Sequence, residues 1–173
     1  MSKISFTVIA LAALVVSPAS AHVTLEKRQA PVGSYYKAVF AVPHGCAGSP
    51  TVKLRVQIPE GVIGIKPMPK PGWTLDMVKG KYATEYELHG SKLSEGVKEV
   101  VWSGGKLADG HYDEFVMSTF LTGNLKPNSM LYFPVVQECE QGVSRWIDIP
   151  AQGAGHSHDD KSPAPGVKLM PKP

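Results

Sequence analysis

Apolar and polar residues alternate along most of the chain, with the two-residue period of strands that bury one face. The clearest case is residues 51–58, where Val52, Leu54, Val56 and Ile58 are separated by polar side chains. From this pattern we predict eight strands, at residues 36–42, 51–58, 73–79, 82–88, 97–102, 112–121, 130–136 and 143–149.

Turn-forming residues separate most of these segments. Pro, Gly, Asn, Asp and Ser gather at residues 59–61, 71–72, 103–105, 109–110 and 127–129. No stretch of about a dozen residues holds the apolar stripe of a helix, and 17 Gly and 15 Pro argue against a helical bundle. We therefore predict an all-β fold, an antiparallel β-sandwich of immunoglobulin-like or cupredoxin-like kind, with a closed barrel as the alternative.

The first 21 residues have the pattern of a cleavable signal peptide. Lys3 precedes an apolar run over residues 4–16, and Ala19-Ser20-Ala21 fits the small-residue rule for cleavage. The run is shorter than the roughly 20 residues that cross a bilayer. We expect a periplasmic or secreted mature chain that begins at His22 and has no transmembrane anchor.

The composition changes after residue 150. Residues 151–173 are rich in Gly, Pro, His and charged side chains and contain few apolar ones. Such a composition is typical of disorder. We predict one folded domain over residues 22–150 and a disordered tail over residues 151–173.

The charge of the chain bears on its partners. It holds 18 Lys and Arg against 15 Asp and Glu, a net charge of +3, with both signs interspersed. Proteins that bind nucleic-acid phosphates cluster their basic residues on one surface. We therefore expect no nucleic acid as a partner.

Cys46 and Cys139 are the two cysteines of the chain. They lie too far apart in sequence to form a CxxC motif, and exported thiols are usually paired. We predict a disulfide between them, with a catalytic or metal-binding thiol pair as the alternative.

A histidine at the start of the mature chain has chemistry that an internal histidine lacks. Its free amine and its Nδ1 can close a six-membered chelate ring on one metal ion, and amines and imidazoles of this kind lose their protons near neutral pH. Two nitrogens with added oxygen donors suit Cu(II), which prefers tetragonal N,O sites. The alternative is that cleavage leaves His22 at the terminus by chance.

Five segments carry a family resemblance: AHVTLE, AVFAVPHGCAGSPTVKLRVQIPEGV, KPMPKPGWTL, VVWSGGKLADGHYDEF and LYFPVVQECEQGVSRW. Together they resemble the YcnI-like domain of secreted copper-binding proteins, over nearly the whole mature chain to about residue 149. The resemblance implies a β-sandwich with a mononuclear Cu(II) site, made by one histidine at the mature N-terminus and a carboxylate and bordered by a Trp. Matched residue by residue, these are His22, Glu114 and Trp146.

The predicted strand 112–121 is compatible with this role for Glu114. Phe115, Met117 and Leu121 share one parity, so Glu114 faces the other way and can reach a ligand. An ionised carboxylate balances part of the charge of a divalent ion. A solvated glutamate without a role is the alternative, and Asp113 is the next candidate if Glu114 is not the ligand.

Trp146 shares the parity of Ser144 and Asp148, opposite Val143 and Ile147, which predicts that it is not a simple core residue. Indole has an N–H but no lone pair for a metal. We predict that Trp146 covers the copper and excludes water, with packing against the disulfide as the alternative.

The remaining histidines give weaker predictions. His156 and His158 lie beside two aspartates in the predicted tail and indicate a weak second metal site, since ordering a flexible segment costs entropy. We interpret His44 as a turn or solvated residue, and whether it approaches the copper stays open.

The chain lacks the G-x-S-x-G and H-x-x-x-H motifs of common hydrolases. We predict that it is no enzyme but a Cu(II) carrier, buffer or metallochaperone of copper homeostasis, which exchanges copper with another trafficking protein. The alternatives are an envelope adhesion or assembly module with incidental metal binding, and a copper-dependent oxidase.

Overall fold

The structure, a computed structural model, describes residues 22–150 and 162–172. The predicted signal peptide and residues 151–161 lie outside this part. The described residues form strands and no helix. The strands are β1 Thr24–Leu25, β2 Gln29–Pro31, β3 Ser34–Val42, β4 Thr51–Gln57, β5 Val62–Pro67, β6 Thr74–Leu88, β7 Ser91–Leu107, β8 Asp113–Leu121, β9 Met130–Tyr132, β10 Val135–Cys139, β11 Val143–Trp146 and β12 Gly166–Met170.

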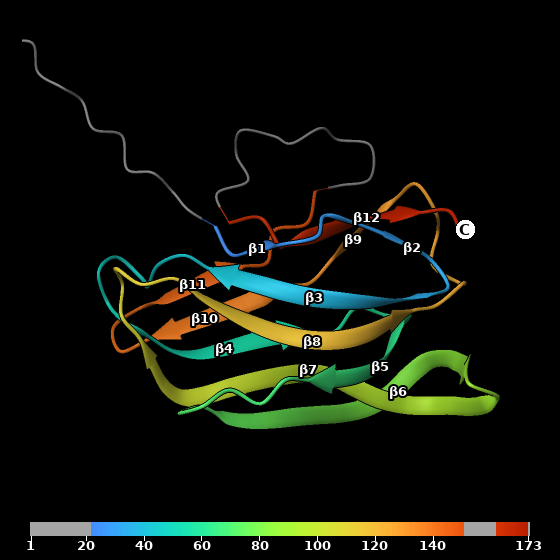
Figure 1. Ribbon diagram of the computed structural model, residues 1–173, viewed down its shortest axis with the longest axis horizontal. Coiled ribbons are helices and arrows are strands. Elements are labelled where there is room, and N and C mark those ends of the chain that lie inside the picture. Colours follow the sequence, from blue (N-terminus) through green and yellow to red (C-terminus); the bar gives the residue numbers. More distant parts are fainter. Residues whose placement is uncertain (1–21, 151–161, 173) are drawn as a thin grey trace, which may run out of the picture.

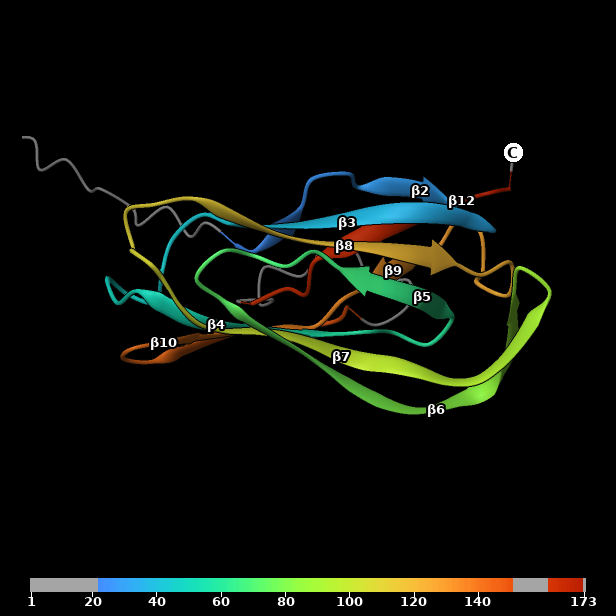
Figure 2. The same cartoon turned by 60° about the horizontal axis from the view of Figure 1, so that its bottom comes forward.

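Two sheets make the sandwich. The first has the order β1-β3-β8-β5, the second has the order β11-β10-β4-β7-β6, and the pairings in both are antiparallel (Figure 1). Figure 2 shows them as two layers, with β3 and β8 in one and β4, β7 and β6 in the other. The predicted β-sandwich is confirmed.

The core lies between these layers because alternate side chains of both sheets point inward. Phe40 and Phe115 enter it from the first sheet, and Leu54 and Trp102 from the second, each at most 1% exposed. The rings of Trp102 and Phe115 meet edge to face with their centroids 5.5 Å apart. This aromatic contact ties the two sheets together.

Several predicted strand boundaries are wrong. Residues 74–79 and 82–88 belong to one long strand, β6, and the predicted turn at residues 103–105 lies inside β7. Gly105 is needed there for close approach, since a Cβ at this position would lie 2.1 Å from the Trp73 ring. Glycine in this segment therefore makes room for an aromatic side chain and does not end the strand.

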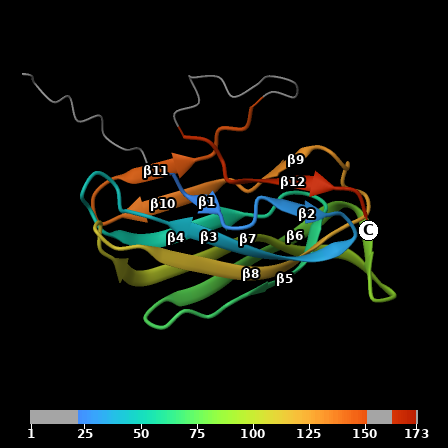
Figure 3. The ribbon, with the colours of Figure 1, turned by 45° about the horizontal axis from the view of Figure 1, so that its top comes forward.

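The prediction of disorder over residues 151–173 is wrong for residues 162–172. Strand β12 lies between β2, to which it is parallel, and β9, to which it is antiparallel (Figure 3). Val167 and Leu169 of β12 are at most 1% exposed. Two inward-pointing apolar side chains are enough for a short strand that has a partner on each side, and the average composition of the tail conceals them.

Candidate metal site

His22 and Trp146 are in contact. His22 directly precedes Val23 and β1, whereas Trp146 ends β11 in the other sheet. Their ring centroids are 5.2 Å apart with the planes inclined by 72°, an edge-to-face arrangement. The structure thus brings together two of the three residues predicted for the copper site.

The predicted orientation of β11 is wrong. Trp146 is 5% exposed and belongs to the core, whereas Val143 and Ile147 are 50% and 43% exposed. Strand β11 is the edge of its sheet and is only four residues long, so the outward apolar residues at its ends have no covering layer. Trp146 therefore enters from the interior, with its ring against His22.

The indole N–H of Trp146 forms a hydrogen bond within the core. It donates to Oε1 of Gln137 at 3.0 Å, and Gln137 is a residue of β10 that is 1% exposed. Because indole has only this one polar hydrogen, Trp146 offers His22 its ring and no hydrogen bond. Trp146 therefore contacts the imidazole without using either of its nitrogens.

Glu114 lies on the outer face of the first sheet, in the same row as Thr24. Thr24 pairs with Ala41, and Ala41 pairs with Glu114, so these three residues form one row across β1, β3 and β8. His22 lies two residues before Thr24, outside β1, and its ring contacts the Trp146 indole. Two strand spacings, roughly 10 Å, separate the backbones of Thr24 and Glu114.

The structure does not bring Glu114 into contact with His22. Within residues 22–150 and 162–172, no three His, Cys, Asp or Glu residues are grouped closely enough to hold a metal ion. The predicted outward orientation of Glu114 is confirmed, because it is exposed while Phe115 and Met117 are buried.

The carboxylates near Glu114 give this face a negative character. The Tyr112 hydroxyl donates to Oε1 of Glu114 at 2.6 Å, and this hydrogen bond is the largest cause that raises the pKa of Tyr112 to about 12. Burial and the charges of Glu114, Glu26 and Asp113 raise it further. Sequence reasoning missed Glu26, although it shares the parity of His22 and Thr24.

Asp113, the alternative ligand, has its own cation. Its Oδ1 lies 2.5 Å from Nζ of Lys70 and also accepts the backbone N–H of Glu114 at 2.8 Å. Lys70 also donates to the backbone carbonyl of Glu114 at 3.1 Å. The carboxylate of Glu114 forms no ion pair in the described part of the chain, so it is better placed than Asp113 to meet a metal ion.

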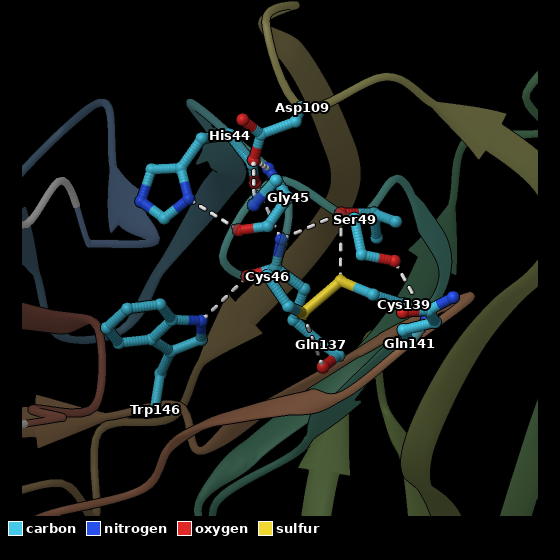
Figure 4. The surroundings of a disulfide bond; sticks show 11 residues. His44, Gly45, Cys46, Ser49, Asp109, Gln137, Cys139, Gln141 and Trp146 are labelled. Atoms are coloured by element: carbon cyan, nitrogen blue, oxygen red, sulfur yellow. Dashed lines mark hydrogen bonds between the residues drawn. A yellow bond between two sulfur atoms is a disulfide. The ribbon is translucent and has the colours of Figure 1, made fainter.

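The predicted disulfide between Cys46 and Cys139 is confirmed and leaves no free cysteine among the described residues. It lies directly beside the residues that hold Trp146 (Figure 4). The backbone carbonyl of His44 accepts a hydrogen bond from Nε2 of Gln137 at 2.7 Å. Figure 4 shows the His44 imidazole and the Trp146 indole on the same side of the disulfide loop.

An open pocket of about 300 Å³ adjoins His22. Arg28 and Tyr132 line it, together with Pro150 and Pro163, which lie close to the two borders of residues 151–161. His156 and His158, predicted as a weak second site, fall within that segment.

The fold and the buried core define a disulfide-linked β-sandwich of immunoglobulin-like kind, and comparisons with known proteins agree. Residues 22–169 match the family model described as a domain of unknown function, DUF1775, so the chain belongs to this family, which includes the YcnI proteins. The match includes β12 almost to its end. No curated protein matches the chain.

A solved structure has the same architecture. It is the crystal structure of an uncharacterized protein from Nocardia farcinica, described as revealing an immunoglobulin-like fold. The two chains are 25% identical with a TM-score of 0.63, over 86% of this chain and 98% of that one. In the described part of the present chain, no helix is long and apolar enough to cross a membrane.

Proposed function

We propose that the mature protein binds one Cu(II) ion outside the cytoplasm and acts as a copper carrier, buffer or metallochaperone, not as an enzyme. The observation that carries this proposal is the contact of His22 with a buried, hydrogen-bonded Trp146. The amine and Nδ1 of His22 supply two nitrogens, Glu114 supplies an oxygen, and Trp146 covers one side of the ion.

The donor set of this face fits Cu(II). Nitrogen and carboxylate oxygen are the ligands that Cu(II) prefers, whereas Cu(I) prefers thiolates and thioethers. Cys46 and Cys139 are bonded to each other, so neither supplies a thiolate. The carboxylates of Glu114 and Glu26, both near Tyr112, add negative charge for a divalent cation.

Binding requires Glu114 to turn toward the N-terminus. Its carboxylate is exposed and hydrogen-bonded to Tyr112, an exposed residue, so the change exchanges one surface contact for a metal bond. Rotation of a surface side chain of this kind is fast and inexpensive. Thr24, two residues after His22, lies in the same row of the first sheet as Glu114, so the movement runs along this row.

Two further observations support a binding role in an exported protein. A disulfide is typical of proteins in oxidising compartments. A site with one histidine and a carboxylate is a hard ligand set that favours Cu(II) over Cu(I), and therefore favours storage or transfer over redox turnover.

The test is copper titration of the protein that begins at His22, compared with a variant that has one extra Ala before His22. The extra residue converts the amine into an amide and leaves every side chain unchanged. We expect one tightly bound Cu(II) with nitrogen couplings in the EPR spectrum, and an affinity at least about 100-fold lower in the extended variant. Equal affinity of the two proteins, or an exported chain whose intact mass shows a start other than His22, would contradict the proposal.

A role in envelope assembly is the second candidate, favoured by exposed apolar side chains on one border of the molecule. Val143, Ile147 and Ile149 are between 43% and 54% exposed. If the protein binds no copper but retains an envelope partner in a pull-down that Ile147→Ser abolishes, assembly replaces copper binding as its function.

A further inference from the structure

Gln137 occupies a buried position beneath the His22–Trp146 contact. It lies on β10 between the disulfide and Trp146, and it is 1% exposed (Figure 4). Its amide makes three hydrogen bonds: Nε2 donates to the His44 carbonyl and to Oγ1 of Thr51, both at 2.7 Å, and Oε1 accepts from Trp146 at 3.0 Å.

These partners allow only one orientation of the amide. The Trp146 indole can only donate, so it must face Oε1, and the His44 carbonyl can only accept, so it must face the amino group. A flipped amide would place its amino group against the Trp146 indole N–H, and its oxygen against the His44 carbonyl oxygen. The side chain is therefore fixed, and it fixes the indole in turn.

The anchors on the other side of Gln137 are rigid. Thr51 is fully buried at the start of β4. The segment that carries His44 leads directly into Cys46, which the disulfide joins to the strand of Gln137. Gln137 thus connects a covalently constrained loop to the Trp146 ring, which contacts His22.

We propose that Gln137 is the positioning residue of the copper site: its amide holds the Trp146 indole against His22, so that the ring covers the bound ion at a fixed distance. This inference rests on the proposed function for its copper readout. A polar group buried among apolar neighbours costs free energy unless it is paired, and here two of the three bonds anchor the amide while the third orients the Trp146 indole. Removing a partner of a metal ligand typically changes metal affinity by about 10-fold to 100-fold, and because Trp146 covers the ion without ligating it, we expect a smaller change here.

The first test uses the protein that begins at His22 without any metal. The ring current of Trp146 shifts the proton resonances of the His22 imidazole, and Gln137→Met removes the acceptor that holds the indole. We expect the His22 resonances of Gln137→Met to move toward those of Trp146→Phe. Unchanged His22 resonances in Gln137→Met would overturn the proposal.

The second test is Cu(II) affinity with a matched control. Thr119 is also fully buried and also donates to a backbone carbonyl, that of Tyr36 at 3.0 Å, but it lies on β8, in the other sheet from Gln137 and Trp146. We expect Gln137→Met to bind Cu(II) a few-fold more weakly, as we expect for Trp146→Phe, with altered EPR parameters, and Thr119→Val to keep the affinity of the unmodified protein. Equal losses in both variants would mean that Gln137 acts only through general stability.

A double variant tests the route of the effect. If Gln137 acts through Trp146, then Gln137→Met adds less than about 2-fold to the loss already present in Trp146→Phe, because the two side chains form one unit. If Gln137→Met lowers the Cu(II) affinity of Trp146→Phe as much as it lowers that of the unmodified protein, Gln137 does not act through Trp146. Should Gln137→Met fail to fold, Gln137→Asn keeps the amide but is one methylene too short to reach all three partners, and the same comparisons apply.

The failure of this inference can be distinguished from the failure of the proposed function. If the unmodified protein binds no Cu(II) but the His22 resonances depend on Gln137, the copper function is wrong and Gln137 still positions Trp146. If Cu(II) binds tightly and neither the resonances nor the affinity depends on Gln137, the copper function stands and the positioning role is wrong.

Discussion

His22 and His89 each lie against an aromatic ring, and the two contacts differ in what they leave for chemistry. His22 meets Trp146 edge to face, and Trp146 is 5% exposed. His89 stacks on Tyr35 with centroids 6.0 Å apart, and Tyr35 is 55% exposed. The first aromatic ring belongs to the core, whereas the second lies on the surface.

The hydrogen bonds show the same contrast. The Tyr35 hydroxyl lies 2.7 Å from Nε2 of His89, so one ring nitrogen of His89 is already used. Trp146 directs its only polar hydrogen to Gln137, so it restricts the His22 ring without using its nitrogens. An aromatic neighbour can therefore either form a hydrogen bond with a ring nitrogen of a histidine, or contact the ring without using its nitrogens.

The largest expected effect comes from removing each histidine in turn. In the protein that begins at residue 22, we expect His22→Ala to lower Cu(II) affinity at least about 100-fold, since the chelate loses its imidazole. We expect His89→Ala to change it less than about 2-fold, because His89 lies at the β6–β7 turn with Tyr35 as its partner. Competition titration measures both. An equal loss of Cu(II) affinity in His89→Ala would show that the two histidine contacts do not differ in their importance for copper binding.

Glu114→Gln is expected to have the next largest effect. The amide keeps the size of the side chain but removes the negative charge, so we expect an affinity about 10-fold lower and altered EPR parameters. Asp113→Asn is the matched control, since Lys70 already neutralises Asp113. If Asp113→Asn gives the larger change, Asp113 is the ligand and the assignment of Glu114 is wrong.

Trp146→Phe is expected to change access to the copper more than its binding. We expect unchanged stoichiometry, an affinity within a few-fold, and copper that takes up azide and is reduced more easily. The buried Oε1 of Gln137 loses its donor, which costs about 1–3 kcal/mol in the free energy of unfolding. Visible spectra with added azide, and urea unfolding, check the two effects separately. Tyr35→Phe, which alters the other contact, should change neither.

Much of the fold follows from residue alternation, most clearly in β4, where the buried Leu54 and Val56 alternate with the polar Lys53, Arg55 and Gln57. The two-residue strand β1 is too short to show a period, and its pairing is determined by β3. Strand β12 could not be predicted from composition, because its burial depends on β2 and β9 far away in sequence.

The site was predictable to a lesser extent. The export pattern and the family resemblance led to His22, Glu114 and Trp146, and the structure brings the first and the third together. Gln137 could not be found in this way, since a glutamine in an alternating strand has the pattern of an outward residue. Only the three-dimensional arrangement shows that it points inward, between the disulfide and the indole.

The smallest expected effect concerns His156 and His158, which lie outside the described residues. Strand β12 decides how they are tested: a truncation from residue 155 would also remove Val167 and Leu169 from the core, so any loss of copper could reflect unfolding. The double variant His156→Ser and His158→Ser removes the imidazoles and keeps the strand. We expect the tightly bound Cu(II) to stay within about 2-fold in affinity, and only weak uptake beyond one ion per chain to disappear, as measured by equilibrium dialysis with excess copper. If the double variant loses the tight ion while an extra Ala before His22 does not, the copper is held by these two histidines, and the contact of His22 with Trp146 is as ordinary a packing contact as that of His89 with Tyr35.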